Sequence, residues 1–198
     1  DQDEASERFY KIAEQKSPDR AHTARCYQRA VDCLIGVGRI DKGIDTYHRL
    51  IALIADSARI YTWAGDAFGK AGSNDIALEA YDKAIELEPS NFVPYINRGW
   101  TYQTIGKTEK ALSDYSKAIE LNPEEIMPFT NRGILLYNQA RYEEALKDLK
   151  KSVEMDPQSG GVRRYLGLTQ YHLGNTEDAR WELNIARGLG DKEAEEVI

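Results

Sequence analysis

The residues best suited to bind a metal or to act as nucleophiles are three histidines and two cysteines. His22, His48 and His172 are scattered along the chain, and none stands with cysteine or acidic residues in a metal-binding motif. Cys26 and Cys33 are seven positions apart, which on a helix places them on one face but about 10 Å apart along the axis. That distance is too long for a disulfide, so we expect two buried thiols that pack as small hydrophobic groups.

Other catalytic patterns are equally weak. The string that begins Gly36-Val37-Gly38 lacks the third glycine of a dinucleotide loop and a preceding strand, so it predicts a turn between helices. Neither a phosphate loop nor a nucleophile elbow is found. Acidic pairs are frequent, but 30% of the residues are charged, and helical surfaces of that kind produce such pairs without catalysis. We therefore predict no enzymatic activity, no catalytic residues, no metal and no cofactor.

Composition limits the class of protein and of partner. The chain has 198 residues, 41% of them hydrophobic, which is typical of one folded domain or a short repeat array. A net charge of −7 provides no broad cationic surface, so we do not expect a nucleic-acid partner. No apolar run approaches the roughly 18 residues that cross a bilayer, so membrane insertion is not expected. Cytoplasm is the default expectation, although the chain starts at Asp1 and a removed targeting segment stays possible.

The strongest signal is an internal period of 34 residues, because four kinds of position share it. It relates these glycines, alanines, prolines and aromatic residues: Gly65, Gly99, Gly133 and Gly167; Ala77, Ala111, Ala145 and Ala179; Pro89, Pro123 and Pro157; Tyr61, Tyr95 and Phe129.

Each kind of residue suits its place in a helical hairpin. Small glycine and alanine side chains let two helices approach closely. A glycine such as Gly106 can end the first helix with a positive φ. The residue before each proline is disfavoured in the helical region, so Glu88-Pro89 and its equivalents end the second helix. Pro94 and Pro128 then fall near the start of the next helix, where a missing N–H has little cost.

These motifs resemble the tetratricopeptide repeat family over roughly residues 24–190, most closely over 58–190. The resemblance implies an all-α fold, a right-handed superhelical α-solenoid of stacked antiparallel helix pairs. Leu136 and Leu149 replace usual aromatic residues, Arg163 replaces another, and repeat 24–57 is degenerate. We predict a single repeat domain, residues 1–198, with these parts: an N-terminal capping helix or half repeat, 1–23; a degenerate repeat, 24–57; repeats 58–91, 92–125, 126–159 and 160–193; and a C-terminal cap, 194–198, with Asp191 as its N-cap.

In this family the first helices line a concave groove. The resemblance places Asn97 and Asn131 there, one repeat apart, and an amide can both donate to and accept from a peptide unit. The alternative is that these asparagines bond their own scaffold. An apolar groove floor is expected from Trp63, Ile96, Trp100, Met127 and Ile134, although Trp100 could instead be a core residue. The predicted peptide-binding residues are Arg59, Trp63, Asn97, Trp100, Thr130, Asn131, Ile134, Asn138, Arg164 and Tyr165.

Arg25, Arg29 and Arg59 are expected to cluster at the N-terminal end of the groove. Guanidinium groups suit carboxylates, so this cluster predicts a preference for acidic segments. The family's carboxylate clamp does not match, because its first lysine and asparagine would fall at Thr62 and Asp66.

The pattern as a whole predicts a scaffold or adaptor that binds a protein or peptide segment. One alternative is a self-assembling structural protein, since the apolar face of the lone N-terminal helix needs cover and could exchange between copies. A second copy or that helix could also fill the groove. Another alternative is a regulatory fragment of a larger enzyme or secretion machine.

Overall fold

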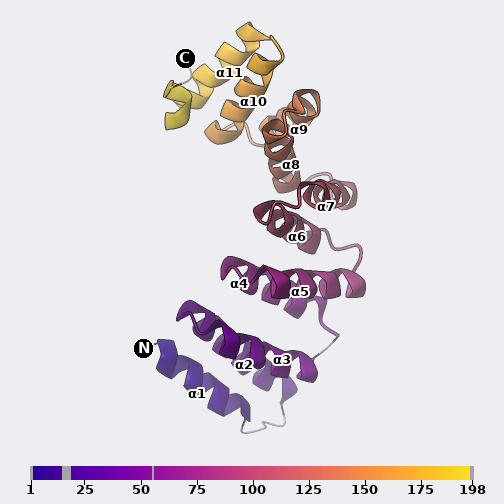
Figure 1. The fold of residues 1–198 in the computed structure, drawn as a ribbon, viewed down its shortest axis with the longest axis vertical. Helices are drawn as coiled ribbons and strands as arrows, with labels where there is room; N and C mark the ends of the chain where they lie inside the picture. Colours follow the sequence, from indigo (N-terminus) through magenta and orange to yellow (C-terminus); the bar gives the residue numbers. More distant parts are fainter. Residues whose placement is uncertain (1, 15–18, 55, 197–198) are drawn as a thin grey trace. The chain divides into compact units, whose positions relative to one another are not determined.

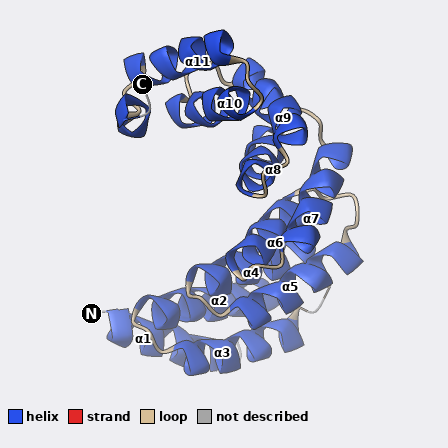
Figure 2. Cartoon of the chain, turned by 45° about the horizontal axis from the view of Figure 1, so that its top comes forward, coloured by secondary structure: helices blue, strands red, loops and turns tan. Residues whose placement is uncertain are grey.

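The computed structural model describes residues 2–14, 19–54 and 56–196, and all regular secondary structure in these ranges is helical (Figure 2). Eleven α-helices and one short 3-10 helix follow one another through the described residues (Figure 1). Their bounds are α1 Gln2–Glu14, α2 Arg20–Gly36, α3 Ile40–Leu53, α4 Ala58–Lys70, α5 Asn74–Leu87, α6 Val93–Thr104, α7 Thr108–Leu121, α8 Ile126–Asn138, α9 Tyr142–Met155, α10 Gly160–His172, α11 Thr176–Gly188 and η1 Lys192–Glu196.

The chain divides into two compact units, residues 1–97 and 98–198, and the division falls within α6. In the first unit α1 packs on α2, α2 on α3, and α4 on α5, while α2 also contacts α4. In the second unit α7 packs on α8, α8 on α9, α9 on α10, and α10 on α11. Each unit is therefore a stack of consecutive helix pairs, which confirms the predicted all-α class.

The ranges 58–91, 92–125, 126–159 and 160–193 each hold one pair of helices, whereas α2 begins at Arg20, before residue 24. The lone N-terminal helix is α1. At the other end Asp191 accepts a hydrogen bond from the Ala194 amide at 3.0 Å, which confirms it as the N-cap of η1. Residues 197–198 of the predicted cap lie outside the described residues. The repeat boundaries themselves stay predictions.

The turn inside each hairpin requires a left-handed residue at one fixed position. Gly38, Gly72, Gly106 and Gly174 occupy it with φ between 73° and 83°, as predicted for Gly106. The equivalent residue between α8 and α9 is Ala140, with φ of 57°. The hydrogen bonds around Gly106 recur there, since Arg141 N donates to Leu136 O at 3.0 Å. Repeat 126–159 therefore makes the same turn with alanine, a residue that is strained in the left-handed conformation.

Replacing Ala140 by glycine should remove this strain. We expect Ala140→Gly to raise the free energy of unfolding by about 0.5–1 kcal/mol, the strain relief less the entropy that glycine adds to the unfolded chain. The matched change Gly106→Ala should lower it by a similar amount, because no atom lies within 4 Å of the added Cβ and only backbone conformation changes. Urea unfolding followed by circular dichroism measures both, and a destabilised Ala140→Gly variant would contradict the strain.

In the second unit, two forked ion pairs each join the two helices of one hairpin. Arg98 donates from Nε and Nη2 to the Asp114 carboxylate at 2.8 and 2.7 Å. Arg132 makes the same fork with Asp148 at 2.7 and 2.8 Å, and its Nη1 donates to Ser116 at 2.8 Å. Both aspartates are buried, so each fork offsets the cost of removing a carboxylate from water.

Removing one member of such a pair should cost far more than removing both. Asp148→Ala leaves the Arg132 guanidinium partly buried without its partner, and we expect the free energy of unfolding to fall by roughly 2–4 kcal/mol. The double variant Arg132→Met, Asp148→Leu should recover most of that loss. Arg141→Met is the control, because the Arg141–Glu144 pair is exposed and its loss should have a much smaller effect. Urea unfolding measures all three variants, and a double variant no more stable than Asp148→Ala would contradict this coupling.

Arg163 stands at the repeat position of Tyr95 and reproduces the hydrogen bond that this tyrosine makes. In repeat 92–125 the Tyr95 hydroxyl donates to the carbonyl oxygen of Pro89 at 3.3 Å. Arg163 Nε donates to the equivalent carbonyl of Pro157 at 2.8 Å, and its Nη1 pairs with buried Glu182 at 2.6 Å. The departure from the repeat pattern thus keeps the link to the preceding loop and adds an ion pair.

Candidate functional site

The predicted peptide-binding residues fall into both units, and each set is described by itself. Arg59, Trp63 and Asn97 belong to the first unit, and the second unit holds the rest: Trp100, Thr130, Asn131, Ile134, Asn138, Arg164 and Tyr165. The structure separates these residues into some that bond their own scaffold and others that face solvent.

An open stripe runs along α8 in the second unit. Met127, Asn131, Ile134 and Asn138 recur at spacings of four, three and four residues, which places them on one helix face. Met127 is 51% exposed and Asn138 is exposed, while Asn131 and Ile134 are half-buried. The Asn131 amide has no hydrogen-bond partner among the described residues. The α8 stripe therefore offers solvent an amide between apolar groups.

Trp100 on α6 is also open to solvent, since 50% of its surface is exposed. It is therefore not a core residue, which removes the alternative interpretation of this position. The expectation for Ile96 on the same helix is wrong, because Ile96 is buried with 4% exposure. A short β-branched side chain is covered by its neighbours here, whereas the longer indole of Trp100 protrudes.

Asn97, by contrast, is held by the scaffold of the first unit. Its Nδ2 donates to Asp66 Oδ1 at 2.7 Å, and the same oxygen accepts a hydrogen bond from the Tyr81 hydroxyl at 2.8 Å. One repeat later, the position of Asp66 is occupied by Trp100, so Asn131 meets no equivalent carboxylate. The two asparagines share a repeat position but differ in their bonding.

Trp63 and Arg59 also differ in how far they are open to solvent. Trp63 is half-buried against two core clusters of the first unit. Burial raises the pKa of Asp32, and the nearby Trp63 side chain and Arg29 guanidinium oppose the rise. Arg59 is exposed and makes no ion pair with the described residues. Of these two, only Arg59 is fully available to a ligand.

Three further predicted residues contact their neighbours in the second unit. The Thr130 hydroxyl lies 2.6 Å from that of Ser152. Arg164 pairs with Asp191 at 3.2 Å and with Glu193 at 2.9 Å, and its guanidinium lies 4.6 Å from the centre of the Tyr165 ring. Thr130 and Arg164 therefore hold parts of the fold together.

An aromatic cluster between α8, α9 and α10 was not predicted. The Tyr142 and His172 rings stack at 4.5 Å with an interplanar angle of 4°, and Tyr137 lies edge-on to Tyr165 at 5.4 Å. Burial raises the pKa of Tyr137. These residues do not follow the 34-residue period, so no signal in the sequence groups them.

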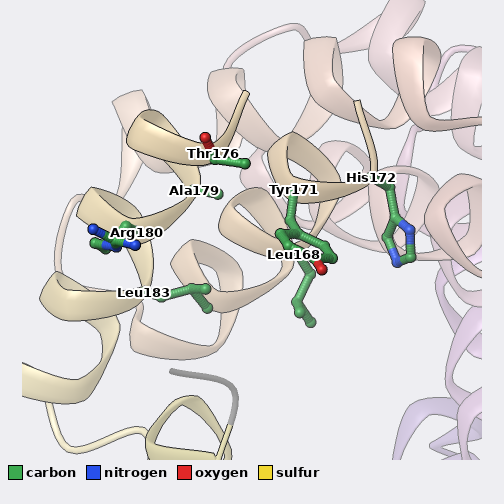
Figure 3. Close-up of a pocket in the computed structure, with 7 residues that line it drawn as sticks. All are labelled: Leu168, Tyr171, His172, Thr176, Ala179, Arg180 and Leu183. Atoms are coloured by element: carbon green, nitrogen blue, oxygen red, sulfur yellow. The ribbon is translucent and has the colours of Figure 1, made fainter. Parts of the chain in front are cut away.

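A cavity of about 400 Å³ lies on the last hairpin (Figure 3). Its walls come from α10 and α11 and consist of Leu168, Tyr171, His172, Thr176, Ala179, Arg180 and Leu183. One repeat earlier, the positions of Ala179 and Leu183 carry core residues and that of Leu168 carries the half-buried Ile134, all in a cluster with Val162 and Leu166 of α10. This cavity is therefore the stacking face of the last hairpin, part of which Ala194 of η1 covers.

A second cavity, of about 430 Å³, lies between α1 and α2 in the first unit. It is lined by Phe9, Arg25, Gln28, Arg29, Asp32 and Cys33. Cys26 and Cys33 are both free thiols, which confirms that no disulfide joins them. Cys26 is buried as expected, but Cys33 is only half-buried, because it faces this cavity.

Other kinds of site are not found in the described part of the chain. No group of three or more histidine, cysteine or acidic residues there could hold a metal ion. No described helix is both long enough and apolar enough to cross a membrane.

Stacked helical hairpins, a recurring glycine turn and an open first-helix face define the class of helical-repeat proteins. The family is also evident in the sequence: tetratricopeptide repeat models match residues 93–125 and 130–192, and a model described as TPR repeat matches 65–106. The chain belongs to the tetratricopeptide repeat family. No curated protein matches its sequence.

Several solved structures share this fold at low sequence identity. A crystal structure of MamA has a TM-score of 0.73 and 18% identity, covering 83% of this chain and 96% of that one. MamA from Desulfovibrio magneticus RS-1 has a TM-score of 0.73 and 16% identity, covering 86% and 95%. YrrB, described as a TPR protein with an unusual peptide-binding site, has a TM-score of 0.70 and 22% identity, covering 94% of each chain.

The two asparagines should respond differently to replacement by alanine. Asn97→Ala removes a hydrogen bond to a carboxylate, so we expect the free energy of unfolding to fall by about 1–2 kcal/mol. Asn131→Ala removes no bond to the described residues and should change it by less than about 0.5 kcal/mol. Urea unfolding of both variants tests the assignment, and equal losses would show that Asn131 also bonds the scaffold.

Proposed function

We propose that this chain is a non-catalytic scaffold that binds a segment of a partner protein on the open face of its first helices. The observation that carries the proposal is the exposure of Trp100 and Met127, each about half accessible on a first helix. Large apolar side chains that remain exposed are typical of contact sites.

The chemistry of the α8 stripe suits a polypeptide ligand. Asn131 offers a donor and an acceptor to a peptide unit, whatever the side chains of the ligand. Met127 and Ile134 lie one turn before and after it, and Met adapts its shape to different apolar partners. Asn138 continues the same face. The peptide-binding site named for YrrB supports this proposal by analogy of fold.

Self-assembly is the second candidate, and the structure weakens the observation behind it. Ser6 and Ala13 of α1 are buried, and Tyr10 lies against the Tyr27 ring and under the Arg49 guanidinium. The inner face of α1 is thus covered within its own chain, so an exchange between copies would have to break these contacts first.

Site-specific cross-linking in the native extract tests the proposal. A photoreactive amino acid at Asn138, an exposed position, would label whatever lies along the α8 stripe. We expect a discrete adduct whose yield falls about tenfold in the double variant Trp100→Ala, Asn131→Ala, because the anchor and the amide are lost together. The adduct's mass identifies the partner, and an adduct of two copies of this chain would favour self-assembly instead.

The control is Trp181→Ala, Asn184→Ala, which removes the same residue types from the second helix α11. Trp181 is 61% exposed, more than Trp100, so non-specific adhesion would be reduced at least as much in this control. If both double variants lose the adduct equally, or if neither loses it, the partner does not bind through Trp100 and Asn131.

A further inference from the structure

The cavity between α1 and α2 is lined by more cationic groups than acidic ones. Arg25 and Arg29 lie one turn apart on the same face of α2, and both are exposed. Arg25 makes no ion pair with the described residues. The Arg29 guanidinium lies over the Phe9 ring, 5.8 Å from its centre. A neutral ring orients a guanidinium without cancelling its charge.

A third exposed arginine stands at the equivalent repeat position of the next first helix, α4. Arg59 stands 34 residues after Arg25, at the same repeat position on α4, and α2 contacts α4. Arg59 is exposed and also makes no ion pair with the described residues. Asp32 is the acid among the residues that line the cavity, and the Arg29 guanidinium acts on it. The three arginines therefore outnumber the acid beside them.

We propose that this cavity is an anchor for an acidic peptide segment, whose carboxylates pair with Arg25, Arg29 and Arg59. This inference rests on the proposed scaffold function and names the chemistry of one ligand. The cavity, of about 430 Å³, has room for a few side chains of a peptide segment. It is too small to receive the folded surface of a partner protein. Gln28 lines the same wall and offers an amide to the backbone of the segment.

The charge of the whole chain favours an acidic peptide over nucleic acid. The net charge is −7, so a long polyphosphate would be repelled outside this cluster. A short peptide needs to place only its carboxylates near the three guanidinium groups. Guanidinium–carboxylate pairs are frequently bidentate, which gives them geometric specificity as well as strength.

Fluorescence anisotropy with a labelled hexaglutamate peptide tests the anchor. We expect the full chain to bind hexaglutamate and to show no binding of labelled hexalysine. Arg25→Gln, Arg29→Gln should weaken hexaglutamate binding about tenfold, since two charge-assisted contacts are lost. The charge-reversed pair Arg25→Glu, Arg29→Glu should bind hexalysine instead. Circular dichroism checks that each variant is folded. We expect no change in folding, because the replaced side chains are exposed.

The matched control is Lys150→Gln, Lys151→Gln, which removes two exposed charges from α9 and changes the net charge equally. It should alter hexaglutamate binding by less than twofold. Equal weakening in both pairs would show a general charge effect and overturn the anchor, as would no binding of hexaglutamate or tighter binding of oligothymidine. Self-association that hexaglutamate reverses and the arginine pair abolishes would assign the cavity to a second copy.

This experiment separates failure of the anchor from failure of the scaffold. The cross-linked adduct at Asn138 depends on Trp100 and Asn131 in the second unit, whereas the arginines lie in the first. Loss of hexaglutamate binding with an intact adduct pattern would leave the scaffold function standing without its acidic anchor.

Discussion

One close contact recurs in four successive hairpins and sets the orientation of their helices. A large side chain of each second helix lies directly on a glycine of the first helix. These pairs are Gly65 and Tyr81, Gly99 and Tyr115, Gly133 and Leu149, and Gly167 and Leu183. At Gly133 an added Cβ would lie 2.9 Å from Leu149 Cγ, so any larger residue would push the helices apart. This contact fixes which face of each first helix is inside, and the opposite face is left to other uses.

Much of the fold follows from this constraint and was predictable from the sequence. Glycines and alanines that recur every 34 residues mark the close contacts, and glycines between the helices mark the turns. The leucines at 136 and 149 replace aromatic residues yet stay buried in the core, because packing requires volume more than ring chemistry. The role of Arg163 could not be predicted from the sequence, because its partners Pro157 and Glu182 are identified only by the folded geometry.

The candidate site was less predictable because its residues depend on neighbours one repeat away. Asn97 and Asn131 lie in the same tripeptide, Asn-Arg-Gly, and the sequence alone treats them alike. Their environments differ because Asp66 stands 31 residues before Asn97, whereas Trp100 stands 31 residues before Asn131. The acid binds its asparagine to the scaffold, whereas the indole leaves Asn131 without that partner. Thr130 and Arg164 also bond side chains that the sequence pattern does not place beside them, Ser152 and Asp191.

This dependence explains how a repeat protein can gain a binding surface without disturbing its core. The close glycine contacts and the forked Arg–Asp pairs use the inner face and the second helices, and they leave the residue after each contact glycine free to vary. That residue is Asp66, Trp100 or Ile134 in successive repeats, and it stands 31 positions before Asn97, Asn131 and Tyr165 respectively. The residue at this position decides whether the next first helix bonds its neighbour or faces a ligand. The fold therefore identifies where a partner can bind, and the variable residues decide which partner it is.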